Sequence, residues 1–164
     1  MRTRTSIASW RPNYSPLKEM TVQIASTIDA GAPAARLTDA ADLVARVTLA
    51  VIFVFSGADK LFIHTAANAQ YMQAVGLPLA GVLVYPAGLV EFAGGILLAV
   101  GYQARLAAAA LAAFTVVATL LFHQFWAAPA DQAVLQTIMF LKNVAIFGGL
   151  LHVFAHGTGR LKLG

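Results

Sequence analysis

Four long apolar stretches limit what this chain can fold into. They cover residues 43–63, 79–101, 106–126 and 134–154. Each holds about 20 residues, enough for a helix rising about 1.5 Å per residue to cross the ~30 Å hydrocarbon core of a bilayer. None shows the alternating pattern of a barrel strand. The sequence therefore predicts an all-α protein, a bundle of four transmembrane helices.

The composition also requires lipid as a solvent. Hydrophobic residues make up 59% of the 164 residues and charged residues only 11%, against about 25% charged in a typical soluble domain. A soluble protein of this size would leave much of that apolar surface in water. The chain contains no cysteine, which excludes disulfides, thiolate metal sites and covalently attached haem within it.

The basic residues outside the apolar stretches predict the orientation. The loops over 64–78 and 127–133 contain no Lys or Arg. The positive-inside rule then places the N and C termini in the cytoplasm. Binding to anionic lipid headgroups explains the net charge of +4 more simply than binding to nucleic acid does. The basic residues of the terminal segments and the remaining loop are Arg2, Arg4, Arg11, Lys18, Arg36, Arg105, Arg160 and Lys162.

One membrane domain is expected over residues 43–157. A polar, partly flexible cytoplasmic segment over 1–42 precedes it, and a short basic cytoplasmic segment over 158–164 follows it. A short surface helix is expected over 17–30, between proline and glycine breaks. The first segment has no apolar run long enough for a signal-peptide core, so the first stretch is expected to act as the insertion signal.

Glu91 is the most informative ionisable residue. It lies about 18 Å along the second stretch by helical rise. A charged side chain in hydrocarbon is costly, so it usually marks a pocket, a proton path or a structural ion pair. Two interpretations stay open. Glu91 either accepts and releases a proton, or it is a buried anion whose pairing only fixes helix packing.

The other stretches also contain polar residues. Lys142 lies beside Asn143 at a depth near that of Glu91, and a buried lysine needs an anion to stay charged. We therefore predict that Glu91 and Lys142 are neighbours. Arg46 and Lys60 share a face of the first stretch, where they either snorkel to opposite headgroup layers or point into the bundle.

His123 ends a polar stripe on the third stretch, as an interfacial hydrogen-bonding residue or as a proton carrier. A bis-histidine haem site lacks a second histidine at that depth, and no metal site is predicted. Together the polar residues predict a core in the outer half of the membrane. Glu91 and His123 are the candidates for proton transfer. The candidates for ligand binding are Lys60, Lys142 and Asn143, with Arg46 guarding the inner end.

The ordered motifs of the membrane domain, over about residues 40–157, resemble the DoxX family of four-helix membrane proteins. The resemblance implies a bacterial inner-membrane protein. For some members it also implies a link to membrane redox chemistry, including thiosulfate:quinone oxidoreductase and oxidative-stress complexes. Asp59 beside Lys60 departs from the pattern. In chain order the motifs are Arg46; Phe53-x-x-x-Gly57-x-x-Lys60-Leu61; Gln70-Tyr71-Met72 before Gly76-Leu77-Pro78; Glu91; Gly101 with Arg105; His123 with Phe125-Trp126; and Phe140-x-Lys142-Asn143 before Gly148-Gly149.

The leading hypothesis is a membrane component of a redox system that binds a quinone-like ligand or docks a redox partner protein. Within the apolar stretches, basic side chains outnumber acidic ones by one. This excess positive charge suits a carbonyl-bearing ligand but also a lipid phosphate. The main alternative is a non-catalytic structural or assembly protein whose buried ion pair only fixes helix packing. A small-solute permease would require a homo-oligomer, and no broken helix pair marks a substrate site. Whether the protein is an enzyme, and which cofactor it binds, are left open by these residues.

Overall fold

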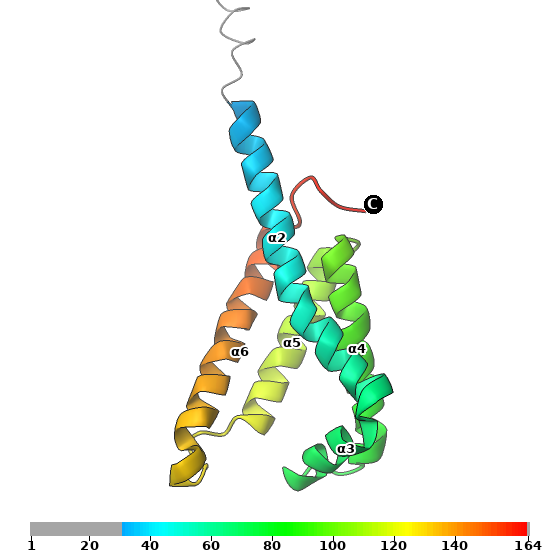
Figure 1. Cartoon of the computed structure of the whole chain (residues 1–164), viewed down its shortest axis with the longest axis vertical. Coiled ribbons are helices and arrows are strands. Elements are labelled where there is room, and N and C mark those ends of the chain that lie inside the picture. Colours follow the sequence, from blue (N-terminus) through cyan, green and yellow to red (C-terminus); the bar gives the residue numbers. More distant parts are fainter. Residues whose placement is uncertain (1–30, 164) are drawn as a thin grey trace, which may run out of the picture. The chain divides into compact units, whose positions relative to one another are not determined.

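The computed structural model describes residues 31–163, which form helices joined by short turns (Figure 1). Four segments are long and apolar enough to cross a membrane: Arg36–Ile63, Ala80–Val100, Ala104–Phe122 and Ala130–His156. The described range contains no strand, which confirms the all-α prediction of four spans. The surface helix expected over 17–30 lies outside the described residues. The elements are α2 (Gly31–Ala58), the π-helix η1 (Asp59–Ile63), α3 (Thr65–Ala74), α4 (Ala80–Val100), α5 (Ala104–Phe122) and α6 (Ala130–His156).

The observed ends of the spans differ from the predicted ones. The first helix is already formed at Gly31, so part of the polar segment before residue 43 is helical. The third ends at Phe122, because the backbone of His123 leaves the helical region (φ −126°, ψ 53°). Residues 123–129 then form the turn to α6. The segment over 64–78, expected to be a loop, contains the short helix α3.

Glycines allow α2 and α4 to pack closely. A Cβ atom added at Gly57 would collide with the backbone nitrogen of Phe92 and would lie 2.7 Å from the carbonyl oxygen of Gly88. A Cβ at Gly95 would lie 2.9 Å from the backbone nitrogen of Val54. Small residues at such contacts are typical of membrane helices, whose association depends on close van der Waals packing. The close approach brings the end of the first span over the middle of α4.

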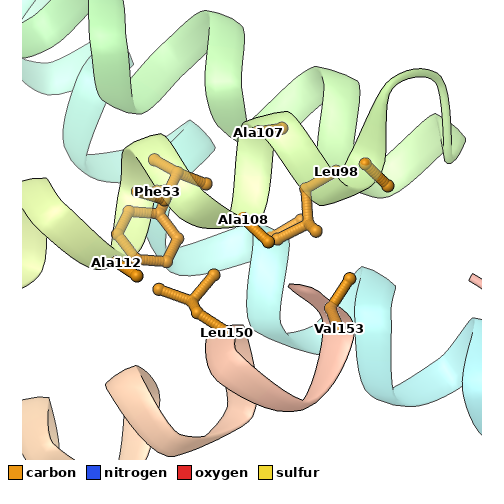
Figure 2. Close-up of a cluster of buried hydrophobic side chains, with 10 residues drawn as sticks. Phe53, Leu98, Ala107, Ala108, Ala112, Leu150 and Val153 are labelled. Atoms are coloured by element: carbon orange, nitrogen blue, oxygen red, sulfur yellow. The ribbon is translucent and has the colours of Figure 1, made fainter. Parts of the chain in front are cut away.

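The larger hydrophobic core lies where α2, α4, α5 and α6 meet (Figure 2). The helix α5 packs against both α4 and α6 and contributes mainly alanines, which let its neighbours come near. A smaller cluster of Met72, Ala80 and Val84 lies where α3 meets α4. The buried residues of the larger core are Ala50, Phe53, Leu98, Ala104, Ala107, Ala108, Leu111, Ala112, Leu150 and Val153.

Arg46 anchors the C-terminal segment, residues 157–163, to the bundle. Its side chain is only 2% exposed. Nη1 donates a hydrogen bond to the carbonyl of Thr158 at 3.1 Å, and Nη2 donates one to that of Leu161 at 2.8 Å. The amide of Leu163 donates to the carbonyl of Val100 at 3.0 Å. The segment is therefore held against the middle of α2 and the C-terminal end of α4. We call this end of the bundle the tail end, and the opposite end the α3 end.

We expect Arg46→Met to release the C-terminal segment, because both carbonyls would lose a charged donor. Hydrogen bonds to charged groups contribute about 1.5–3 kcal/mol each. Loss of about 2 kcal/mol would raise the open population of the segment about 30-fold. Hydrogen exchange of the Leu163 amide measures this opening, and Arg36→Met, which removes an exposed arginine, is the control. Equal exchange rates in the two variants would show that Arg46 does not hold the segment.

Candidate functional site

A cavity of about 340 Å³, which we call the polar cavity, lies among the helices. All six described elements contribute to its lining. It brings together four residues of the predicted polar core: Lys60, Glu91, His123 and Asn143. The full lining is Ile52, Phe53, Ser56, Lys60, Asn68, Tyr71, Met72, Glu91, Phe114, Thr115, Ala118, Phe122, His123, Met139, Asn143 and Ile146.

A chain of three polar side chains lines this cavity. The Nζ of Lys60 lies 2.9 Å from Oε2 of Glu91. Ser56 connects the same two residues, since its Oγ accepts from Lys60 Nζ at 2.7 Å and donates to Glu91 Oε1 at 3.1 Å. Glu91 is only 6% exposed. Both carboxylate oxygens are thus in contact with a donor, Oε1 with Ser56 and Oε2 with the ammonium of Lys60.

The predicted pairing of Glu91 with Lys142 is wrong. Glu91 pairs with Lys60, and the side chain of Lys142 is exposed and is not part of the lining. The physical reason is the rotation of α6. Adjacent residues point about 100° apart around a helix, so with Asn143 lining the cavity, Lys142 points away from it. Position along the two helices alone therefore could not predict which side chains face each other.

The π-helix η1 positions Lys60. Its wider turn is closed by the amide of His64, which donates to the carbonyl of Asp59 at 2.8 Å. Single π-turns of this kind occur frequently at functional sites. The carboxylate of Asp59 lies 2.6 Å from His64 Nδ1 and accepts from Asn68 Nδ2 at 2.7 Å. Asp59 thus ties η1 to α3, and Asn68 adds an amide to the cavity lining.

His123, the residue that follows α5, and the facing part of α6 supply further polar groups. His123 Nδ1 lies 3.0 Å from Oε1 of Gln136. The two side chains are therefore within hydrogen-bonding distance of each other. Gln136 therefore fixes the orientation of the imidazole. Asn143 lies seven residues further along α6, on the same face of the helix.

Comparison with known proteins identifies the family. The DoxX family model matches residues 41–124, and the SURF4 family model matches residues 87–164. The Inner membrane protein YqjF of Escherichia coli (strain K12) is 34% identical over 128 residues, which cover 78% of this chain and 92% of the relative. The chain belongs to the DoxX family. This DoxX protein is an integral, multi-pass protein of the bacterial inner membrane. No solved structure matches it.

Sequence reasoning missed several residues of the DoxX protein's cavity. Ser56 precedes Lys60 by four residues and so shares its face of the helix, a signal that would have identified it. Asn68 and Tyr71 lie in the segment that was expected to be a loop. Thr115 also lines the cavity, and its hydroxyl already donates a hydrogen bond to the Leu111 carbonyl at 2.7 Å. Arg46, a predicted ligand-binding residue, lies at the tail end and is not part of the cavity lining.

Proposed function

We propose that this DoxX protein is a membrane component of a redox system and binds a quinone-like ligand in the polar cavity. The observation that carries the proposal is the cavity itself, which gathers an ammonium, a carboxylate, an imidazole and an amide from different helices. Aromatic side chains of Phe53, Phe114 and Phe122 also line it. A flat ring with two carbonyl groups fits such a lining, because it needs apolar contacts for its faces and donors for its oxygens.

Each polar residue has a definite role in this proposal. Lys60 and Asn143 donate hydrogen bonds to the ring carbonyls, Lys60 taking the role expected for Lys142. Reduction of a quinone to a quinol consumes two electrons and two protons. A redox partner protein supplies the electrons, and Glu91 and His123 pass the protons. Both side chains line the polar cavity, where they would lie beside the bound ring.

A neighbouring apolar cavity supports a ligand with a long hydrocarbon tail. It has a volume of about 410 Å³ and shares Lys60, Met72, Phe114, Ala118 and Phe122 with the polar cavity. Its other walls come from Leu77, from α4 and from α5, and several of them are exposed at the surface that lipid covers. A ring bound beside Lys60 would extend its tail through this groove between α4 and α5 into the bilayer.

The proposed orientation places the polar cavity in the periplasmic half of the membrane. Arg105, Arg160 and Lys162 all belong to segments at the tail end. The positive-inside rule favours the cytoplasm for that end. A redox partner that exchanges protons with the cavity would then approach the α3 end from the periplasm.

The adjacent residues Asn143 and Lys142 give a matched test of ligand binding. We expect a photoreactive quinone, added to membranes containing the protein, to label the polar cavity. Asn143→Leu removes a donor of the cavity at nearly constant volume, so labelling should become about tenfold weaker, as for the loss of one good hydrogen bond. Lys142→Met, one residue away on the exposed face, should label like the original protein.

Mass spectrometry of the labelled peptides reads out both the site and the yield. Labels in α5 and α6 near Phe114 and Asn143 support the proposal. Equal labelling of both variants, or labels spread over the lipid-facing surface, would contradict it. That outcome would favour the non-catalytic structural or assembly role, for which the paired Lys60 and Glu91 are the supporting observation.

A further inference from the structure

A second polar pocket, separate from the polar cavity, lies at the tail end. Its volume is about 500 Å³. The turn between α4 and α5, the start of α5, the end of α6 and the C-terminal segment line it. Nothing in the proposed quinone chemistry uses this pocket, because it shares no lining residue with the polar cavity. We call it the basic pocket.

The ionisable side chains that line the basic pocket are all basic. Arg105, His156 and Lys162 line it, and no Asp or Glu does. One guanidinium nitrogen of Arg105 donates to the carbonyl of Ala155 at 3.1 Å, which leaves its other donors available. Lys162 forms no ion pair in the described part of the chain. Two acidic residues lie behind the pocket wall at Gly159: a Cβ there would lie 2.9 Å from Asp42 Oδ2 and 3.6 Å from Asp39 Oδ1, and Asp39 pairs with Arg160 at 3.3 Å.

A buried arginine adds positive charge behind one wall of the pocket. Gly101 belongs to this wall, and a Cβ there would lie 2.8 Å from Arg46 Nη1 and 2.8 Å from Cβ of Lys162. Glycine also suits the left-handed backbone at this position (φ 79°). Arg46 Nε is buried and has no hydrogen-bond partner in residues 31–163. Arg46 therefore adds a buried positive charge behind this wall, which the nearby carboxylate of Asp42 offsets in part.

The start of α5 strengthens the preference for an anion. This 19-residue helix begins at Ala104, which lines the pocket, and no side chain caps its first amides. Uncapped amides and the helix dipole both favour negative charge at a helix N-terminus. At about 1.5 Å per residue, α5 is just long enough to cross the hydrocarbon core. Its first residue, and with it the basic pocket, therefore lies at the depth of the lipid headgroups.

We propose that the basic pocket binds a phosphate group, and specifically the phosphodiester of an anionic phospholipid such as phosphatidylglycerol. Arg105 and Lys162 contact the phosphate oxygens, and Arg46 contributes its charge from behind Gly101. Basic pockets between membrane helices are suited to anionic headgroups by this chemistry. Free inorganic phosphate carries the same group, so the test separates the two sources.

The test uses the full chain in detergent, with bound lipid counted by native mass spectrometry. We expect phosphatidylglycerol to bind more tightly than phosphatidylcholine. The double change Arg105→Gln with Lys162→Gln should weaken phosphatidylglycerol binding about 30-fold, as expected for two basic residues near a phosphate. The charge-matched control is Arg36→Gln with Lys142→Gln, two exposed residues outside the pocket. It should bind phosphatidylglycerol like the original protein.

Inorganic phosphate added to the complex distinguishes the sources. Retention of phosphatidylglycerol at high phosphate supports the lipid headgroup as the occupant. Displacement by phosphate, lost in the Arg105 and Lys162 double variant, overturns the lipid assignment and identifies the pocket as a site for free phosphate. Equal affinity for the two lipids, or equal binding by the pocket and control variants, overturns the site itself. The thermal midpoints of both variants without added lipid confirm that each is folded.

Discussion

Replacing Gly57 with alanine is expected to remove most of the folded protein from the membrane. The added Cβ would collide with the backbone nitrogen of Phe92 and would lie 2.8 Å from its Cα and 2.7 Å from the Gly88 carbonyl oxygen. These are backbone atoms of α4, which cannot change rotamer to make room. Overpacking of this kind lowers the free energy of unfolding by about 1–3 kcal/mol. Because the opposing atoms are rigid, we expect a loss of about 3 kcal/mol for Gly57→Ala.

Gly148→Ala is the matched control for this change. It makes the same substitution in a membrane helix, but among residues 31–163 no atom outside the adjoining backbone of α6 lies within 4 Å of the added Cβ. Thermal unfolding in detergent and the amount of protein in the membrane fraction should separate the two variants clearly. Equal stability would show that α2 and α4 do not approach each other as closely as the structure indicates.

The same contact also determines the geometry of the polar cavity. A Cβ at Gly88 would lie 3.0 Å from Cβ of Lys60 and 2.9 Å from Cγ of Leu61. The glycine contacts of α2, η1 and α4 therefore set how near Lys60 comes to Glu91, one turn further along α4. Packing and site chemistry are linked here, because any residue that separates the two helices also lengthens the ion pair.

Hydropathy alone predicted the four spans, because a run of about 20 apolar residues has few other stable solutions. It could not predict helix ends equally well. Because Phe125 and Trp126 are apolar, the third span was predicted to continue to residue 126. Both residues instead lie in the turn after α5 and form an aromatic cluster with Phe140. The helix α3 was missed because its ten residues mix small, polar and apolar side chains without a clear periodic face.

The polar cavity was predicted in part because depth follows directly from position along a helix. Glu91, His123 and Asn143, which were grouped in one polar core for this reason, line the same cavity, and so does Lys60. Which cation meets Glu91 depends on how each helix is rotated and on the π-turn at Asp59–Ile63, and neither follows from hydropathy. The role of Arg46 was hidden for another reason, since its partners are backbone carbonyls of the C-terminal segment.

The second large effect is expected at the ion pair of Lys60 and Glu91. Removing one member of a buried pair leaves an uncompensated charge and costs about 3–5 kcal/mol. Both side chains are mostly buried, at 19% and 8% exposed, so we expect Lys60→Met and Glu91→Gln each to lower the unfolding free energy by about 3 kcal/mol. The exposed Lys142→Met should leave stability unchanged, which separates pairing from the loss of any membrane lysine.

The double variant, Lys60→Met with Glu91→Gln, decides what the pair is for. Without either charge no desolvated ion remains, so stability should return to within about 1 kcal/mol of the original, a coupling of several kcal/mol in the mutant cycle. Quinone labelling of this stable variant then gives the answer. Lost labelling would show that the charges serve the ligand, as proposed. Full labelling in a restored fold would show that Lys60 and Glu91 only hold the helices in register, and the structural or assembly role would stand instead.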